Sequence, residues 1–190
     1  MTGIILFRAQ PFHNGHLAQI KRAYDDLQKL GGDLYIIIGS ADKMGTKRNP
    51  LPISIRLDLV RNSLAEVYGV EDLCHIHVIP LEDLSDEANN TYSWGQYLYN
   101  EMCEITNDKD FIFYYSDKPE IALSWFDEHV ILHFWFRFLP RVNDVNATKV
   151  RDCLLHLTDC QDNYDTLKHM LPSYVYSKYP EICYYIINAK

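Results

Sequence analysis

The chain has 190 residues, 47% of them hydrophobic and 23% charged, which is typical of a folded domain of ordinary size and argues against a disordered chain. Its net charge of −8 argues against nucleic acid and anionic membrane surfaces as partners, although a small polyphosphate needs only a local cluster of cations. No apolar stretch reaches the ~18 residues of a membrane-spanning helix, and the five scattered cysteines indicate reduced thiols, so we expect a cytoplasmic protein.

Apolar runs of strand length alternate with amphipathic helical patterns along the chain. The expected strands are 4–7, 33–39, 74–80, 111–115 and 130–138. The expected helices are 17–30, 53–67, 94–105, a segment opened by 116–120, a segment that begins at Asn146, and the tail 165–190. This alternation predicts an α/β fold: a doubly wound parallel five-stranded sheet with helices on both faces, followed by C-terminal helices. No internal repeat, low-complexity tract or linker divides residues 1–190, so we expect a single domain.

The stretch 3–16 carries the clearest chemical signal in the sequence. Its apolar run Ile4–Phe7 is followed by Arg8 and Gln10, and then by the tetrapeptide HNGH at the start of a helical pattern. A strand that turns sharply into a helix presents unpaired N–H groups and the positive end of the helix dipole, which suits a phosphate. Imidazoles at that point can donate to phosphate oxygens. The turn therefore predicts a nucleotide-binding site at the carboxyl ends of the strands, where doubly wound sheets bind their ligands.

The segment FRAQPFHNGHL, residues 7–17, resembles the first motif of the HxGH nucleotidyltransferase superfamily. Within that superfamily it is most similar to the archaeal-type nicotinamide mononucleotide (NMN) adenylyltransferases, whose members read close to GR-x-QPFH-x-GHL. Further similar segments follow in family order: IGSA at 38–41, RNPL at 48–51, Arg56, IPLED at 79–83, Trp94, YSDKP at 115–119 and NATKVR at 146–151. The sequence departs from the family at Phe7, where relatives have glycine, and at Asn146, where they have serine. Asn146 can still cap the helix that follows it.

The resemblance implies a Rossmann-like nucleotidyltransferase domain that transfers the adenylyl group of ATP to NMN, giving NAD and pyrophosphate. The implied partners are the small molecules ATP and NMN, with Mg²⁺ on the triphosphate, and a homo-oligomeric assembly is implied as well. In this reaction the 5′-phosphate of NMN attacks the α-phosphorus of ATP in line, so the protein mainly positions substrates and neutralises charge. Some relatives also carry a Nudix hydrolase, but the sequence contains no segment of the Nudix pattern.

The resemblance assigns catalytic roles to His13, His16, Arg8 and Arg151. The two histidines are implied to donate to the phosphates of ATP and to stabilise charge on the bridging and leaving oxygens. Arg8 is implied to contact phosphate. Thr148 and Arg151 are implied to hold the β- and γ-phosphates, and their spacing of three residues places both on one side of a helix beginning.

The other implied ATP contacts are Gln10, Gly15, Arg56, Ser116 and Asp117. Gln10 orients either the loop or a phosphate, and Gly15 lets the main chain come close to the phosphates. Arg56 matches the arginine of the family's ER segment. Ser116 and Asp117 stand where main-chain groups contact adenine in relatives.

The implied NMN contacts are Gly39, Ser40, Asp83 and Trp94. Trp94 either stacks on the nicotinamide ring or packs in the core. Asp83 either contacts the ribose of NMN or caps the following segment. The loop with Lys43, Lys47 and Arg48 either closes over the phosphates or stays solvated. No residue is assigned to a metal bound by the protein itself.

Two further hypotheses remain open beside the NMN adenylyltransferase. The first is an HxGH nucleotidyltransferase with another phosphate acceptor, namely nicotinate mononucleotide, pantetheine phosphate or a polyol phosphate. The second is a non-catalytic sensor that binds NAD or ATP and signals through a partner. The presence of both histidines and of Thr148 and Arg151 favours an enzyme over the sensor.

Overall fold

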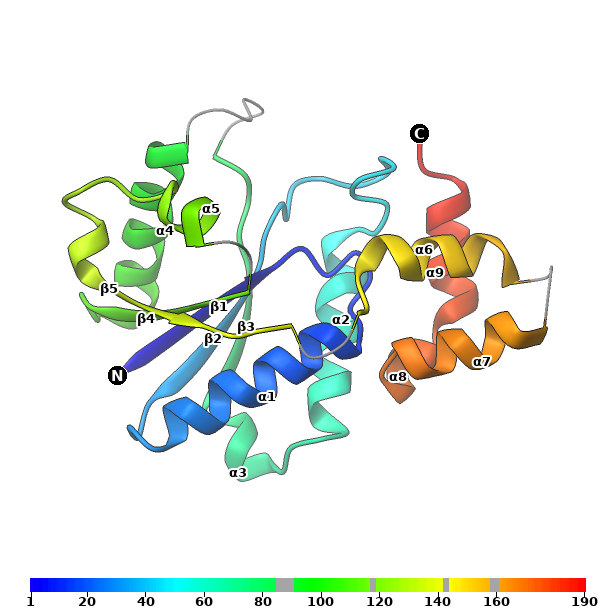
Figure 1. Cartoon of the computed structure of the whole chain (residues 1–190), viewed down its shortest axis with the longest axis horizontal. Helices are drawn as coiled ribbons and strands as arrows, with labels where there is room; N and C mark the ends of the chain where they lie inside the picture. The colour runs from blue at the N-terminus through cyan, green and yellow to red at the C-terminus, as the bar shows by residue number, and fades with distance from the viewer. Residues whose placement is uncertain (85–90, 117–118, 142–143, 158–160) are drawn as a thin grey trace.

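The computed structural model describes residues 1–84, 91–116, 119–141, 144–157 and 161–190 of the chain (Figure 1). Its centre is a five-stranded sheet with the strand order β3-β2-β1-β4-β5, and every pair of neighbouring strands is parallel. The strands are β1 (Thr2–Phe7), β2 (Asp33–Ile38), β3 (Ile76–Pro80), β4 (Phe111–Tyr115) and β5 (Phe134–Phe138). The doubly wound parallel sheet that the sequence predicts is confirmed.

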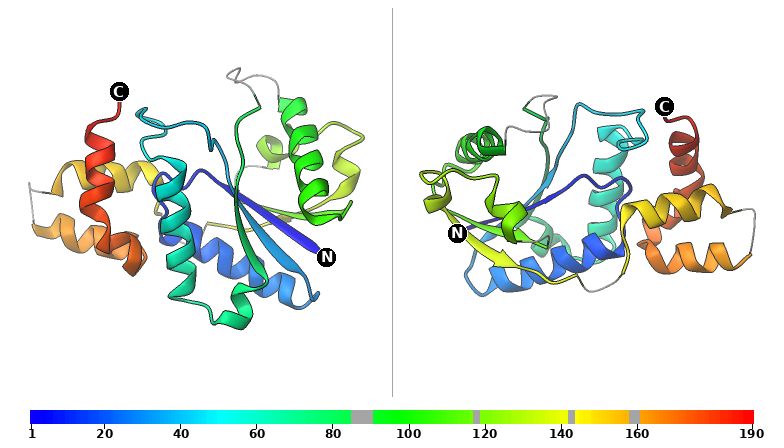
Figure 2. Two further views of the ribbon diagram at one scale, coloured as in Figure 1. Left: turned by 180° about the vertical axis from the view of Figure 1, so that it is seen from behind. Right: turned by 45° about the horizontal axis from the view of Figure 1, so that its top comes forward.

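Helices cover both faces of this sheet, as predicted (Figures 1 and 2). The helices are α1 (Asn14–Gln28), α2 (Ile53–Ala65), α3 (Val70–Leu73), α4 (Thr91–Thr106), α5 (Pro119–Leu123), α6 (Ala147–Leu155), α7 (Gln161–Met170), α8 (Ser173–Ser177) and α9 (Tyr179–Ile187). Successive side chains of a strand point to opposite faces. Ile5 of β1 therefore joins the core under α1 and α2, whereas Ile4 joins the core under α4.

The C-terminal helices α6–α9 pack beside α1 and α2, at the end of the molecule away from α4 and α5 (Figures 1 and 2). Buried Val150, Val175 and Ile182 bring these helices into the same core cluster as α1 and α2. This packing places the beginning of α6 next to the β1–α1 turn, although the two are more than 130 positions apart in the sequence.

Several local predictions differ from the structure. The helical tail predicted at 165–190 is divided into the three helices α7, α8 and α9, which begin at Gln161 and end at Ile187. The strand expected at 130–138 begins only at Phe134, because residues Ile131–His133 form a 3-10 turn. A carboxylate oxygen of Asp127 accepts the N–H of Val130 at 2.8 Å and so winds the chain at this point, while the Val130 side chain stays buried. An apolar run alone does not separate such a turn from a strand. The short helix α3 was not predicted either.

The chain changes direction within the sheet at β1. It builds β2 and β3 outward on one side of β1, and then crosses over to place β4 and β5 on the other side. The carboxyl ends of β1 and β4 thus form the topological switch point, where open α/β sheets bind ligands. The HNGH turn follows β1 and Ser116 follows β4, so both predicted segments lie at this edge.

Two bulk properties accompany the fold. No helix in the described part of the chain combines the length and the apolar character needed to cross a membrane. Cys74, Cys103, Cys153 and Cys183 are free thiols, whereas Cys160 lies outside the described residues.

Candidate functional site

The HNGH turn is built as the cap of helix α1. His13 is the N-cap residue, in an extended conformation, and its Nδ1 accepts the main-chain N–H of His16 at 3.3 Å. Because Nδ1 is the acceptor in this contact, the proton of the neutral ring belongs on Nε2. His13 therefore has one ring N–H that the cap does not use.

The two imidazoles lie face to face beneath the turn. Their ring centroids are 3.7 Å apart with an interplanar angle of 18°, and the ring of Phe7 lies 4.5 Å from that of His16. Phe12 stacks on His16 from a further side, at 5.6 Å. The aromatic side chain that replaces the family's glycine at position 7 thus packs against a predicted catalytic histidine.

This aromatic enclosure keeps both histidines neutral. Burial, with a smaller contribution from the charge of Arg141, lowers the pKa of His13 from 6.5 to about 4. Burial, the neighbouring His13 and Arg141 lower the pKa of His16 well below 6.5. Near pH 7 the pair can therefore offer N–H donors but no formal positive charge.

The lowered pKa values predict that acid destabilises the fold through these rings. Between about pH 6.5 and about 4 the unfolded chain binds a proton at His13 that the folded chain does not bind, so stability falls as the pH falls. One such histidine contributes a slope of about 1.4 kcal/mol per pH unit to the free energy of unfolding. Urea unfolding at several pH values measures this slope. His13→Asn keeps a capping acceptor without the titration, and an unchanged slope in this variant would contradict the assignment.

Arginines gather around the same turn. Arg151 of α6 donates from one guanidinium nitrogen to the main-chain oxygen of Gln10 at 2.7 Å, and from another to the hydroxyl of Thr148 at 3.3 Å. The two segments that the sequence relates to ATP are therefore side by side. Asn146 caps α6 by accepting the N–H of Lys149 at 3.0 Å, as predicted.

The pKa of Arg8 shows that other cations lie near it. Arg8 is exposed at the end of β1, and its pKa is lowered by burial of part of the side chain and by the charges of Arg48 and Arg151. Asp83 acts in the opposite direction. Guanidinium groups that raise one another's electrostatic energy provide a local attraction for an anion in a protein whose net charge is −8.

Arg56 takes a different position from the predicted phosphate contact. It is fully buried, and its guanidinium donates to the main-chain oxygens of Arg8 at 3.1 Å, Gly39 at 2.8 Å and Ser40 at 2.8 Å. Burial lowers the pKa of Arg56 to about 10, so it stays charged at neutral pH. In this structure its side chain ties the ends of β1 and β2 together and presents no surface to a ligand.

Gln10 is likewise used inside the protein. Its amide donates to the main-chain oxygen of Leu51 at 3.2 Å and accepts the N–H of the same residue at 2.8 Å. Of the two roles that the sequence left open for Gln10, this geometry provides the one of orienting a loop. Gly15 leaves room for its neighbours, because a Cβ atom there would lie 3.0 Å from the ring of His13 and 3.2 Å from the main-chain oxygen of Val145.

The residues predicted for NMN divide into two groups. Ser40 donates its hydroxyl to a carboxylate oxygen of Asp83 at 3.0 Å, and it follows Gly39, whose N–H donates to the main-chain oxygen of Phe7 at 2.8 Å. These three therefore lie together beyond β2 and β3. Trp94 is half-buried in the core cluster under α4, with its ring 4.9 Å from that of Trp125. This position corresponds to the alternative in which Trp94 packs in the core.

Of the two residues predicted to border the adenine of ATP, Ser116 is half-buried after β4, and Asp117 lies outside the described residues.

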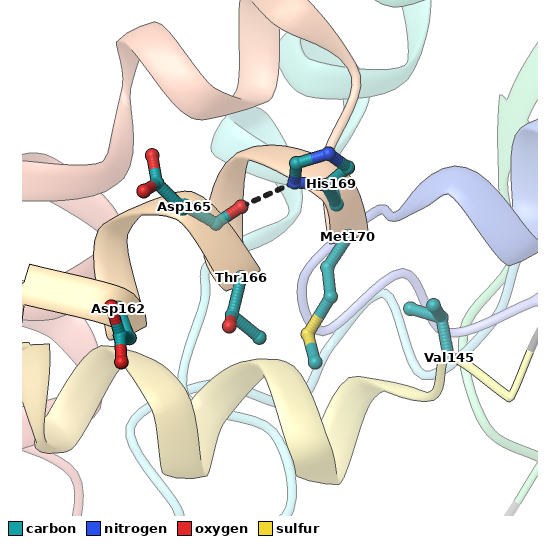
Figure 3. A pocket seen from close by; sticks show the side chains of 6 residues that line it. All are labelled: Val145, Asp162, Asp165, Thr166, His169 and Met170. Carbon is teal, nitrogen blue, oxygen red and sulfur yellow. Dashed lines mark hydrogen bonds between the residues drawn. The ribbon is translucent and has the colours of Figure 1, made fainter.

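A hollow of about 450 Å³ opens between α7 and the residue before Asn146 (Figure 3). It is lined by Val145, Asp162, Asp165, Thr166, His169 and Met170. The side chain of Asn14 donates to the main-chain oxygen of His169 at 2.8 Å, so the hollow adjoins the beginning of α1. Its lining contains two carboxylates and none of the predicted site residues, which makes it a poor place for a phosphate.

A doubly wound parallel sheet with paired neutral histidines and several arginines at its switch point defines an α/β protein suited to nucleotide binding. The chain belongs to the cytidylyltransferase-like family, whose sequence pattern matches residues 8–152. The resemblance to nucleotidyltransferases noted from the motifs is thereby confirmed.

Several known proteins are similar to this chain. A nicotinamide-nucleotide adenylyltransferase of Saccharolobus solfataricus is 36% identical over 96 residues, which is 50% of each chain. One of Haloarcula marismortui is 30% identical over 128 residues, covering 67% of this chain and 57% of the relative. The match thus extends over about half the length of these curated relatives.

Solved structures share the fold. A bifunctional NMN adenylyltransferase/ADP ribose pyrophosphatase of Francisella tularensis, complexed with AMP and a manganese ion, has a TM-score of 0.69 at 18% identity over 98% of this chain and 51% of that chain. A Plasmodium falciparum nicotinic acid mononucleotide adenylyltransferase has a TM-score of 0.54 at 14% identity, over 98% of this chain and 94% of its own. At these identities the likeness concerns the fold.

Proposed function

We propose that this protein transfers the adenylyl group of ATP to NMN, giving NAD and pyrophosphate. The observation that carries the proposal is the meeting of the two motifs: Arg151 of α6 donates to the main-chain oxygen of Gln10, which lies between β1 and the HNGH residues 13–16. The sequence similarity to nicotinamide-nucleotide adenylyltransferases supports the choice of acceptor.

The reaction needs little proton transfer from the protein. A phosphate monoester has a second pKa near 6, so the 5′-phosphate of NMN is already a competent anionic nucleophile at pH 7. Neutral imidazoles suit this chemistry, because they donate N–H groups without having to gain or lose a proton first. We therefore assign His13 and His16 to donation toward the α-phosphate and the bridging oxygen that becomes negative as pyrophosphate leaves.

The arginines neutralise the remaining charge. Arg8 and Arg151 face the β- and γ-phosphates in this proposal, with the Thr148 hydroxyl beside Arg151. Arg56 and Gln10 do not touch substrate but hold the main chain that carries these groups, so we propose that they are positioning residues. Gly15 permits close approach of the phosphates.

The acceptor would lie beyond β2 and β3, where Gly39, Ser40 and Asp83 meet. In this proposal Ser116 and Asp117 border the adenine, and Trp94 reaches the nicotinamide only if its ring presents a face beside Trp125. Among the described residues, no three His, Cys, Asp or Glu side chains are grouped to hold a metal ion. We propose that Mg²⁺ is carried on the phosphate oxygens of ATP, which are ligands that it prefers.

We further propose a single domain, a cytoplasmic location and a homo-oligomer, with no nucleic acid or membrane as partner. The edge strand β5 supports the oligomer, because Trp135 and Phe138 on it are each 53% exposed and a second copy of the chain would cover them.

NAD formation tests the proposal. The protein incubated with ATP, Mg²⁺ and NMN is expected to release NAD, read by a coupled dehydrogenase, and pyrophosphate in equal amounts. Nicotinate mononucleotide, pantetheine phosphate and a polyol phosphate are the comparison acceptors. Turnover with one of these acceptors and none with NMN would be consistent with a nucleotidyltransferase but would show that NMN is not its acceptor. Binding of ATP or NAD without turnover on any acceptor would favour the sensor.

A further inference from the structure

In the connection between β2 and α2, residues 41–52 form a loop that carries Lys43, Lys47 and Arg48. The charge of Arg48 acts on Arg8, a residue of the predicted phosphate site. Its tip is closed by the N–H of Thr46, which donates to the main-chain oxygen of Asn49 at 3.2 Å, and by the Thr46 hydroxyl, which accepts the Asn49 N–H at 3.0 Å. Gly45 has a φ of +71°, a conformation that side chains rarely adopt. The loop thus has a defined shape between its two ends.

Both ends of this loop are held by residues already described. Arg56 binds the main-chain oxygen of Ser40 at 2.8 Å just before the loop, and Gln10 binds both main-chain groups of Leu51 near the end of the loop. Between these two anchors the loop extends over ten residues that include Arg48.

The chain that follows α9 supplies a third anchor at the tip. The N–H of Lys190 donates to the main-chain oxygen of Gly45 at 2.9 Å, and the main-chain oxygen of Lys190 accepts the N–H of Lys47 at 3.1 Å. The two bonds flank Thr46 in the pattern of one parallel β-bridge. All three views show the end of the chain next to this loop (Figures 1 and 2).

The tail is itself fixed to the core. Ile182 and Ile186 of α9 are buried in the cluster shared with α1 and α2, and the Cys183 thiol contacts the main-chain oxygen of Leu154 in α6. The N–H of Ala189 donates back to Ile186 at 3.4 Å, which continues the last turn toward Lys190. The contact therefore connects the loop to the same helices that hold Arg151.

We infer that residues 189–190 position the 41–52 loop, through main-chain hydrogen bonds from Lys190, so that Arg48 stands with Arg8 and Arg151 around the triphosphate. The effect of Arg48 on the pKa of Arg8 agrees with this placement. Lys190 is a positioning residue and touches no substrate. The identity of the bound triphosphate rests on the proposed function, whereas the contact itself does not.

A variant that ends at Asn188 removes both bonds and tests the inference by two readouts. Trypsin cleavage after Lys47 and Arg48, followed by mass spectrometry, should become about tenfold faster, because two main-chain hydrogen bonds no longer oppose local opening of the loop. The KM for ATP should rise about tenfold, with kcat changed by less than about twofold, because the loop acts on binding. Cleavage of the variant at the rate of the full chain would overturn the inference.

Two single substitutions complete the test. Lys190→Ala keeps both main-chain bonds and should match the full chain in both readouts, so a loss here would assign the effect to the side chain and overturn the inference. Lys190→Pro removes only the N–H donor and should give an intermediate cleavage rate in a chain of full length. If the full chain forms no NAD, the proposed function fails, but the cleavage rates still decide the positioning role.

Discussion

Replacing His16 by alanine is expected to lower kcat for NAD formation about 100-fold or more, the scale of losing one preorganised donor to a transition state. The side chain lies between Phe7, Phe12 and His13, so its ring is held in one orientation before substrate arrives. Its Nδ1 is buried and has no hydrogen-bond partner within the described residues, so this ring nitrogen makes no structural hydrogen bond there. The measurement is kcat and KM for both substrates at pH 7.5, beside a thermal unfolding curve.

The matched control is His75→Ala. His75 is an exposed histidine paired with Asp33 at the opposite end of the sheet, 2.7 Å from its carboxylate, and its loss should leave kcat unchanged. A reduction of less than about threefold in the His16 variant, with normal unfolding, would mean that His16 only packs the start of α1.

The sequence predicts much of this site because its signals are local. Alternating apolar runs specify which residues form strands, and the HNGH segment shows where a strand turns into a helix. The order of the strands places that turn and the segment after β4 at one edge, as the general rule for doubly wound sheets requires. The cap at Asn146 is likewise a short-range property, because its acceptor and donor are three residues apart.

The roles of individual polar residues were harder to predict. Arg56 and Arg61 both lie on α2, yet one is fully buried and the other is exposed. Helical periodicity predicts which face of α2 is apolar. It does not predict that Arg56 lies beside the ends of β1 and β2, where main-chain oxygens need a donor. Gln10 binds Leu51 through main-chain groups 41 residues away, and this contact has no signature in either segment. The contact of Lys190 with Gly45 is main chain on both sides, so no side chain could have indicated it.

These contacts indicate how the main chain of the candidate site is held in position. Of the proposed cations, Arg8 is exposed and Arg151 is half-buried, and arginine side chains hold the main chain around them. Arg56 holds the main chain at Arg8, and Arg151 holds that at Gln10. Phosphoryl transfer depends on positioning, so a loss in this supporting layer should reduce activity even where no substrate contact is removed.

Replacing Arg56 by methionine should lower the free energy of unfolding by about 3 kcal/mol or more. The substitution leaves the oxygens of Arg8, Gly39 and Ser40 without their donor, and each buried unpaired group costs about 1–3 kcal/mol. Removing a buried charge offsets part of this loss, because burial already lowers the pKa of Arg56 to about 10. The three carbonyl groups outweigh that gain, since methionine fills the space but donates nothing.

Urea unfolding of Arg56→Met, Arg56→Lys and Arg61→Met separates the explanations. Lysine keeps the charge but lacks the planar fork that reaches three oxygens, so Arg56→Lys should lose nearly as much stability as Arg56→Met. Arg61 donates to one oxygen, that of Val78 at 2.9 Å, from an exposed position on the same helix, and its replacement should cost about 1 kcal/mol or less. Equal losses of unfolding free energy at positions 56 and 61 would show that any arginine of α2 has this effect. Arg56 would then have no special role in joining β1 to β2.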